Sequence, residues 1–220
     1  MRRDPDLRQI LRQRLDATAL RTLDESGLKH AAVVIVVVDE GPGAGLPGFA
    51  AHQDWSDSAA FVLTRRAGHL ARHAGQWALP GGRVDAGEAD LEAALRELHE
   101  ELGLELSPAD VLGRLDDYAT RSGYRIRPFV VWGGSAASFA PDPAEVASAH
   151  RVPLTELLRD DAPILDPPHA GHAHAVLRMP LGTAWVAAPT AAILYQFREW
   201  CLLGRDTRVA HFDQPRFTWR

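Results

Sequence analysis

The chain has 220 residues, of which 46% are hydrophobic and 24% charged, and its formal net charge is -5. This size and composition are those of a soluble globular protein with one core, and the negative charge argues against nonspecific binding of nucleic acid. The longest apolar run, residues 31–38, is far too short to cross a bilayer, and no signal-peptide pattern opens the chain, so we expect no membrane partner.

The first third of the chain predicts one helix and three strands. Apolar residues at helical spacing predict an amphipathic helix within residues 7–20. A continuous β-branched run predicts a buried strand at residues 31–38. Residues 39–58 are rich in glycine and proline, and they predict a long surface loop. A strand is expected again at residues 61–65, and a short one at residues 76–79.

The next segment predicts a helix whose last two turns are crowded with acids. Four leucines recur at helical spacing and define one apolar stripe: Leu91, Leu95, Leu98 and Leu102. Three acids are predicted on roughly the opposite side: Glu97, Glu100 and Glu101. Like charges at this spacing cost about 0.2–0.5 kcal/mol per pair, and Gly103 ends the helix, where its dipole disfavours negative charge. Either a bound divalent cation compensates for this crowding, or the acids form an ordinary solvated face.

The C-terminal half alternates between strands, loops and short helices. Two strands are predicted at residues 111–118 and 125–132, with a turn at residues 121–123. Residues 133–145 form a loop that is expected to cover a site. The remaining predicted elements are helical turns at residues 154–158, strands at 176–179 and 183–186, and a helix from Pro189 to about residue 203. This order predicts an α/β fold with a mixed β-sheet between helices.

Cys201 is the only cysteine, so no internal disulfide can form, and we expect a cytoplasmic protein. Because it falls in an apolar helical pattern, Cys201 is predicted to be packed rather than reactive.

Residues 82–104 match the Nudix box at every fixed position. Gly82 is followed after five residues by Glu88, and seven residues then separate Glu88 from Arg96, which opens Arg-Glu-Leu. One residue later come the paired acids, and then the pair Gly-Leu that closes the box. The chain is therefore identified as a member of the Nudix hydrolase superfamily. The resemblance implies the α/β/α Nudix sandwich and metal-dependent hydrolysis of a diphosphate.

The flanking segments resemble one branch of that superfamily, the coenzyme A pyrophosphatases. Upstream, the resemblance rests on Leu63-Thr64-Arg65-Arg66, Leu70, His73, Gly75-Gln76 and Pro80-Gly81-Gly82. These residues resemble a strand that ends in Thr-x-Arg, a His-x-Gly-Gln element and a Pro-Gly-Gly lead into the box. The chain departs from the branch at Ala67, which is usually Ser, and at Trp77 and Leu79.

The resemblance implies a set of ligands for a divalent cation. By matching positions, these are the carboxylates of Glu97 and Glu101, then Glu100, and the backbone carbonyl of Gly82. Glu88 is a further metal candidate, although its main predicted role is to pair with Arg96 and hold the loop against the helix. Mg²⁺ is the expected ion, with Mn²⁺ as a substitute, because both accept few carboxylates together with substrate oxygens and water.

The catalytic base stays open in the sequence. The predicted catalytic residues are Glu97, Glu100, Arg96 and Glu145. Glu97 or Glu100 is expected to orient or deprotonate the attacking water. Glu145 is an alternative base from outside the box. The competing interpretation is that Glu145 has no catalytic role and is a surface acid at the start of a helix.

Four residues are predicted to contact substrate: Arg65, His73, Gln76 and Gly81. An arginine at the end of a strand can hold a phosphate in bidentate fashion. Trp77 is expected in the core rather than as a stacking platform. Three histidines form an HxxHxH pattern, His169, His172 and His174, but a loop bounded by Pro and Gly gives no warrant for a metal site there.

We expect an N-terminal helical extension at residues 1–28, a Nudix domain at 29–204 and a C-terminal tail at 205–220. The N-terminal helix and a tail with Phe212, Phe217 and Trp219 offer apolar surface. That surface either serves a homodimer or, for the tail, folds back onto its own domain.

Three functions remain open in the sequence. The leading one is Mg²⁺-dependent cleavage of coenzyme A or acyl-CoA at the diphosphate. The second keeps the chemistry but acts on ADP-ribose, a nucleotide sugar or a nucleoside triphosphate. The third is a Nudix-fold module that binds its ligand without turnover. In each case the expected partner is a small nucleoside-diphosphate-type molecule.

Overall fold

The computed structural model describes residues 1–23, 27–70, 73–135, 138–168 and 174–215. Its α-helices are α1 Pro5–Asp16, α2 Asp90–Leu102 and α3 Thr190–Phe197, with short helical turns at Pro108–Asp110, Leu154–Leu158 and Arg198–Leu202. The strands are β1 Lys29–Gly43, β2 Ala51–Arg66, β3 Trp77–Ala78, β4 Gly81–Arg83, β5 Val111–Arg114, β6 Tyr118–Ala119, β7 Tyr124–Gly134, β8 Val146–Pro153, β9 Ile164–Asp166, β10 Val176–Leu181 and β11 Ala184–Ala187.

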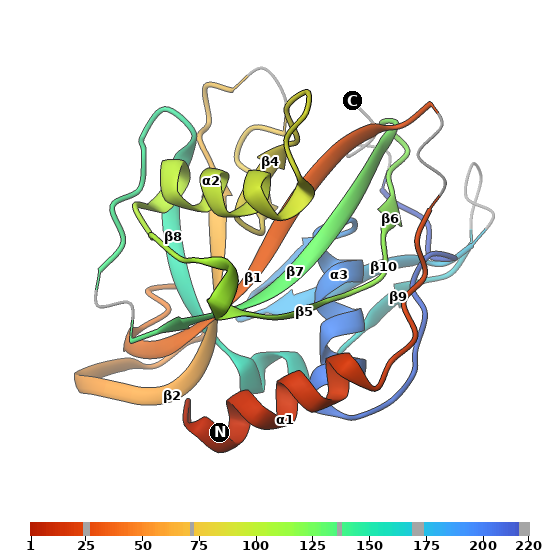
Figure 1. The fold of residues 1–220 in the computed structure, drawn as a ribbon. Coiled ribbons are helices and arrows are strands. Elements are labelled where there is room, and N and C mark those ends of the chain that lie inside the picture. The colour runs from red at the N-terminus through yellow and green to blue at the C-terminus, as the bar shows by residue number, and fades with distance from the viewer. Residues whose placement is uncertain (24–26, 71–72, 136–137, 169–173, 216–220) are drawn as a thin grey trace.

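The main sheet is mixed, as the sequence predicts. Its central path runs β3-β2-β1-β7-β5, with β1 parallel to β7 and antiparallel to β2. Three shorter pairings attach β4 to β1, β6 to β7 and β8 to β2. A second, three-stranded sheet has the order β11-β10-β9. Figure 1 shows α2 on one side of the main sheet and α1 and α3 toward the other side, which confirms the predicted α/β fold.

Strand β1 holds the two layers together because its apolar run is buried on both faces. Val34, Val36 and Val38 share one core cluster with Leu98 of α2. The alternate side chains, such as Ile35, lie in the other cluster, which also contains the buried residues of α1 and α3. A strand covered on both faces reads as a continuous apolar run, since successive side chains point to opposite sides.

The prediction of a long loop at residues 39–58 is wrong. Strand β1 continues to Gly43 and pairs with β2 from Ala51 onward, so that the loop shrinks to the residues between these strands. The register shifts between Asp39, Gly41 and Gly43, and the two glycines have φ angles of 60° and 102°. The glycines that suggested a loop therefore occupy irregular positions inside a strand, where positive φ is needed.

The single strand predicted at residues 111–118 is also wrong, because it is split into β5 and β6. The carboxylates of Asp116 and Asp117 lie in the gap and are buried. Asp116 accepts the backbone N–H of Arg21 at 2.7 Å, and Asp117 accepts that of Leu23 at 3.2 Å. These residues therefore leave the strand to anchor the segment that follows α1.

The apolar surface of α1 and of the described part of the tail is used within the chain. Leu11 is fully buried, in the same cluster as Trp200. Arg208 bonds Asp116 at 3.0 Å, and the Gln214 side chain donates to the Ala119 carbonyl at 3.0 Å. Residues 205–215 thus fold back onto the body of the protein, while the division into three segments stays a prediction.

Cys201 lies in the helical turn that follows α3. Cys201 is fully buried, and burial raises the pKa of its thiol, which confirms that it is packed. Among the described residues, no helix is long and apolar enough to span a membrane.

Candidate metal centre and substrate pocket

Helix α2 positions the acids of the site, but not in the way its leucines suggest. Its buried positions are Ala93, Ala94, Leu98, Glu101 and Leu102, and the helix ends at Gly103 with a φ angle of 67°. Leu91 and Leu95 are only half-buried. The prediction that all three acids oppose the apolar face is therefore wrong for Glu101. This residue neighbours both Leu98 and Glu97 on the helix surface, so it lies at the edge of the buried face.

Glu101 is the most unusual acid of the site, since it is only 4% exposed. Its Oε2 atom accepts the backbone N–H of Gly81 at 3.1 Å. Burial raises the pKa of this carboxyl to about 7, and the charges of Glu97 and Glu145 add to the rise. The Gly81 hydrogen bond and the nearby positive charge of Arg66 act in the opposite direction. The surroundings therefore do not fully stabilise the negative charge of Glu101 at neutral pH.

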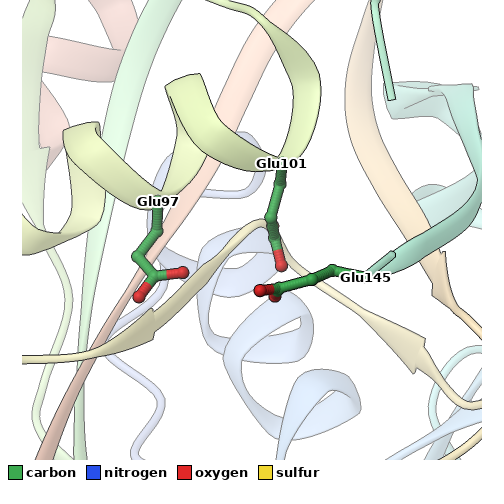
Figure 2. Close-up of side chains that lie close together, drawn as sticks. All are labelled: Glu97, Glu101 and Glu145. Carbon is green, nitrogen blue, oxygen red and sulfur yellow. The ribbon is translucent and has the colours of Figure 1, made fainter. Parts of the chain in front are cut away.

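Three carboxylates meet beside the C-terminal turns of α2. One oxygen each of Glu97, Glu101 and Glu145 lies within 4.8 Å of the others. Figure 2 shows the first two side chains descending from α2 and the third reaching toward them from beside β8. Burial, followed by the charges of Glu100 and Glu145, raises the pKa of Glu97 despite the neighbouring Arg96.

Glu145 reaches the cluster from outside the Nudix box. It precedes β8 directly, so the interpretation of Glu145 as a helix-start acid is wrong. Its backbone carbonyl accepts the N–H of Ala67 at 2.8 Å, and the next residue, Val146, pairs with Arg66 of β2. The backbone pairing of β8 with β2 therefore places the exposed Glu145 carboxylate opposite α2.

The Gly81-Gly82 pair lets the chain pass directly beneath these acids. A Cβ atom on Gly82 would stand 2.4 Å from the carboxyl carbon of Glu97. Gly81 has a φ angle of 137°, and a Cβ there would stand 2.3 Å from the carbonyl oxygen of Ala32. Both positions exclude any side chain, which brings the Gly82 backbone close to the three carboxylates.

Arg96 braces the loop before the helix, as the sequence predicts. Its Nε and one terminal nitrogen bond the two oxygens of Glu88 at 2.9 and 3.0 Å, and it also donates to the Arg83 carbonyl at 3.2 Å. These bonds to Arg96 lower the pKa of Glu88. Arg96 also bonds Glu97 at 3.2 Å and Glu100 at 3.0 Å. Glu88 and Glu100 are thus engaged by Arg96 and lie outside the three-carboxylate group.

A cavity of about 470 Å³ adjoins the glycine pair. Of the predicted substrate contacts, His73, Gln76 and Gly81 line it, whereas Arg65 does not. His73 has a φ angle of 56°, and its Nδ1 atom lies 3.2 Å from the side-chain oxygen of Gln76. Trp77 also lines the cavity and is half-buried, so the expectation that it belongs to the core holds only in part.

Arg65 and Arg66 are consecutive residues of β2, and their side chains contact different groups. Arg65 donates from Nε to the Gly75 carbonyl at 3.1 Å and lies 5.5 Å from the ring centre of Trp77. Arg66 lines the cavity, and its Nε atom is buried with no hydrogen-bond partner among the described residues. Sequence reasoning missed Arg66, although neighbouring residues of a strand point to opposite faces and the Thr-x-Arg pattern ends at Arg66.

The three-carboxylate group fits a hard divalent cation. Its donors are all carboxylate oxygens, the ligands that Mg²⁺ and Mn²⁺ take. Burial, with the charges of Glu97 and Glu145, raises the pKa of Glu101, so a positive charge beside this carboxylate would be favourable. His169 and His172 of the HxxHxH pattern lie outside the described residues. Within the described ranges, Glu97, Glu101 and Glu145 are the group of acids, histidines or cysteines close enough to hold an ion.

Comparison with known proteins places the chain in a family. Residues 29–171 match the NUDIX domain family. The chain is 41% identical over 99 residues to a protein of Yersinia enterocolitica described as "Uncharacterized Nudix hydrolase NudL", and 42% identical over 98 residues to a protein of Yersinia pestis with the same description. Each stretch covers 44% of this chain, and they cover 51% and 49% of the two relatives. The chain thus spans about half the length of the curated relatives it matches.

Among solved structures, a MutT protein from Methanosarcina mazei Go1 is 21% identical, with 64% of this chain and 84% of that chain covered and a TM-score of 0.43. A MutT/nudix family protein from Enterococcus faecalis is 16% identical, with 77% and 54% covered and a TM-score of 0.47. Because the family match alone covers more than half of its residues, the chain belongs to the NUDIX domain family.

We predict that Gly82→Ala weakens cation binding by about 10- to 100-fold, the range seen when groups that orient metal ligands are changed. The added methyl group must displace the Glu97 carboxylate. Titration of Mn²⁺ followed by electron paramagnetic resonance measures the affinity. Gly68→Ala is the matched control, because a Cβ there meets open space at an ordinary φ angle. Unchanged Mn²⁺ affinity in Gly82→Ala would show that Glu97 is not a ligand.

The raised pKa of Glu101 predicts how stability depends on pH. Its folded pKa of about 7 lies above the ordinary value of 4.5, so the folded state binds the extra proton. Without a cation, Glu101 therefore costs stability as the pH rises from about 5 to 7. A cation that replaces the proton restores that stability, so stabilisation by Mg²⁺ grows over the same window. We expect the rise in melting temperature caused by millimolar Mg²⁺ to be several degrees larger at pH 8 than at pH 5.

Thermal melts of Glu101→Gln, with and without Mg²⁺ at both pH values, test this origin. We expect the pH-dependent part of the Mg²⁺ effect to disappear in Glu101→Gln and to persist in Glu100→Gln, whose carboxylate lies outside the three-carboxylate group. Equal Mg²⁺ effects at both pH values in the unaltered protein would contradict the assignment.

Proposed function

We propose that the chain hydrolyses the diphosphate linkage of coenzyme A or acyl-CoA, releasing a phosphopantetheine-type product and adenosine 3′,5′-bisphosphate. The main support for the proposal is that the three-carboxylate group and the 470 Å³ cavity meet at the Gly81-Gly82 pair. This pair lies beneath the carboxylates and also lines the cavity. A diphosphate bound at the glycine pair therefore lies next to acids on one side and to space for an attached group on the other.

Within this proposal the carboxylates of Glu97 and Glu101 hold the cation, with the Gly82 carbonyl as a further oxygen. When bound, Mg²⁺ neutralises charge on the diphosphate and lowers the pKa of a coordinated water. Glu101 contributes a buried carboxylate whose orientation is set by the Gly81 N–H. Arg96 fixes the helix against the loop through Glu88, so that the acids keep their positions.

We propose Glu145 as the group that accepts the proton of the attacking water. Its carboxylate lies in the three-carboxylate group, yet it is exposed and can be reached by water. Glu100 is less suited to this role, because it bonds Arg96 and lies outside the group. A base must lie within hydrogen-bond reach of the proton that it removes, so Glu145 is the better candidate and Glu100 the weaker one.

Arg66 is the proposed phosphate contact. Its guanidinium lines the cavity and is close enough to Glu101 to lower the pKa of that carboxyl. A guanidinium can bond two phosphate oxygens at once, and the buried Nε atom has a donor to offer. His73 and Gln76, on the same wall, remain proposed contacts to the substrate. The small-molecule partner, a cytoplasmic setting and a homodimer remain predictions.

A substrate panel with identification of the products by mass tests the proposal. With Mg²⁺ present, we expect cleavage of coenzyme A and acyl-CoA at the diphosphate and slower cleavage of ADP-ribose, a nucleotide sugar and a nucleoside triphosphate. Addition of a chelator, or the substitution Glu101→Gln, should abolish turnover. Preference for ADP-ribose or a triphosphate would replace the substrate but keep the chemistry. Tight binding without hydrolysis under Mg²⁺ or Mn²⁺ would identify a binding module instead.

The two neighbouring arginines of β2 provide a sharper prediction. We expect Arg66→Ala to lower kcat/KM by about 10- to 100-fold, since a hydrogen bond to a charged group contributes about 1.5–3 kcal/mol. Arg65→Ala removes a similar side chain from the Trp77 side of the strand and should change kcat/KM far less. Steady-state kinetics on the best substrate of the panel measure both. A larger loss in Arg65→Ala would reverse the assignment.

A further inference from the structure

The cavity beside the glycine pair has a wall that comes from outside the family-matched segment. Six residues of β11, of the start of α3 and of the link between them line it: Trp185, Ala187, Ala188, Pro189, Thr190 and Ile193. The NUDIX match ends at residue 171, so this wall belongs to the additional C-terminal part of the chain. The facing side is also aliphatic, since β1 contributes Ala31 and Val33 and β7 contributes Ile126.

The aromatic rings of the cavity are already in contact with cations. The Arg178 guanidinium lies 4.8 Å from the ring centre of Trp185, and Arg65 lies 5.5 Å from that of Trp77. The ring of Tyr124 is approached by two cations, Lys29 and Arg83, each at 5.7 Å. A cation over a ring face competes with a planar base for that face. Apart from the rings, the glycine pair and seven polar residues, the lining is aliphatic or proline: Ala31, Val33, Ala78, Leu79, Ile126, Ala187, Ala188, Pro189 and Ile193. The polar residues are Arg66, His73, Gln76, Arg83, Thr120, Ser122 and Thr190. A flexible, mainly aliphatic chain with a few hydrogen-bonding groups fits this mixture better than a planar nucleobase.

We propose that this cavity binds the long uncharged arm of the substrate, including an acyl group at its end, and that the C-terminal wall selects for it. Trp185, which is 41% exposed, lies at the solvent side of the wall, and the buried Ile193 lies at its inner side. The inference rests on the proposed function, because it places the diphosphate at the glycine pair. The volume of about 470 Å³ falls in the range of small-molecule sites.

Chain length provides the measurable consequence. Each methylene moved from water into an apolar pocket contributes about 0.8 kcal/mol, which corresponds to an affinity increase of roughly three- to fourfold. The increase should stop once the cavity is filled. Preference for acyl-CoA over free coenzyme A follows as the kinetic counterpart, and it should appear mainly in KM.

The first experiment uses probes that lack the diphosphate, so that it does not depend on hydrolysis. Pantetheine, S-butyrylpantetheine and S-octanoylpantetheine are titrated by calorimetry in the presence of a chelator. We expect affinity to rise along this series in the unaltered protein. Ala187→Phe, which fills the cavity from β11, should remove the rise, and Trp185→Ala should reduce it at least threefold. Equal affinity for the three probes would overturn the proposal.

Trp55→Ala is the control for loss of an exposed tryptophan, because Trp55 of β2 is 47% exposed and does not line the cavity. It should leave the probe series unchanged. Since Trp185 is a surface residue, Trp185→Ala keeps the test valid if Ala187→Phe does not fold. Adenosine 3′,5′-bisphosphate is the probe for the nucleotide half of the substrate. If Ala187→Phe abolishes binding of the bisphosphate but not of S-octanoylpantetheine, the cavity holds the nucleobase and the proposal is wrong.

The two proposals fail in different ways. A chain-length series that behaves as expected, together with a panel in which no diphosphate is cleaved, keeps the arm-binding cavity and rejects the proposed function. Cleavage of coenzyme A with the same kcat/KM for free and acylated forms, and with no effect of Ala187→Phe, keeps the function and rejects the arm-binding cavity.

Discussion

The site depends on crowding carboxylates around a buried one. Glu101 is nearly inaccessible to water, and two further carboxylates lie within 4.8 Å of it. Such an arrangement is unfavourable unless positive charge or hydrogen-bond donors compensate for it. The protein supplies one N–H from Gly81 and the neighbouring charge of Arg66, and these leave the pKa of Glu101 at about 7. A bound cation would supply the missing positive charge, which is why the three carboxylates are a candidate metal site.

The surrounding fold serves to keep these charges together. The continuous apolar run of β1 packs against α2 on one face and against the C-terminal helices on the other, so one strand connects the layer that carries the acids with the layer behind the sheet. Strand β8 carries Glu145 to α2 through its pairing with β2. Arg96 connects the loop at Glu88 with the acidic turns of the helix. The cluster is therefore assembled from two distant segments, helix α2 with Glu97 and Glu101 and the start of β8 with Glu145.

Local patterns in the sequence predicted helix α2 and the pairing of Glu88 with Arg96, because both depend on residues close together in the chain. The order of the predicted strands and helices, rather than any local pattern, predicted the mixed sheet. The long loop at residues 39–58 was wrong, since glycines inside an irregular strand have the same composition as a loop. Arg66 and the approach of Glu145 to Glu101 depend on strand pairing between distant segments. Composition and spacing carry no information about the register between distant strands, so only the tertiary structure shows where Arg66 and Glu145 lie.

The buried carboxylate of Asp116 connects three segments that are far apart in the chain. It receives the backbone N–H of Arg21 from the segment after α1, the side chain of Gln196 from α3 and that of Arg208 from the tail. The segment after α1 and the segment that contains Arg208 are thus joined at one acidic residue within the family-matched part of the chain. Residues 29–171 on their own would lose all three donors and the α1 cover of the core, so we expect the family-matched segment to need both flanking segments for its stability.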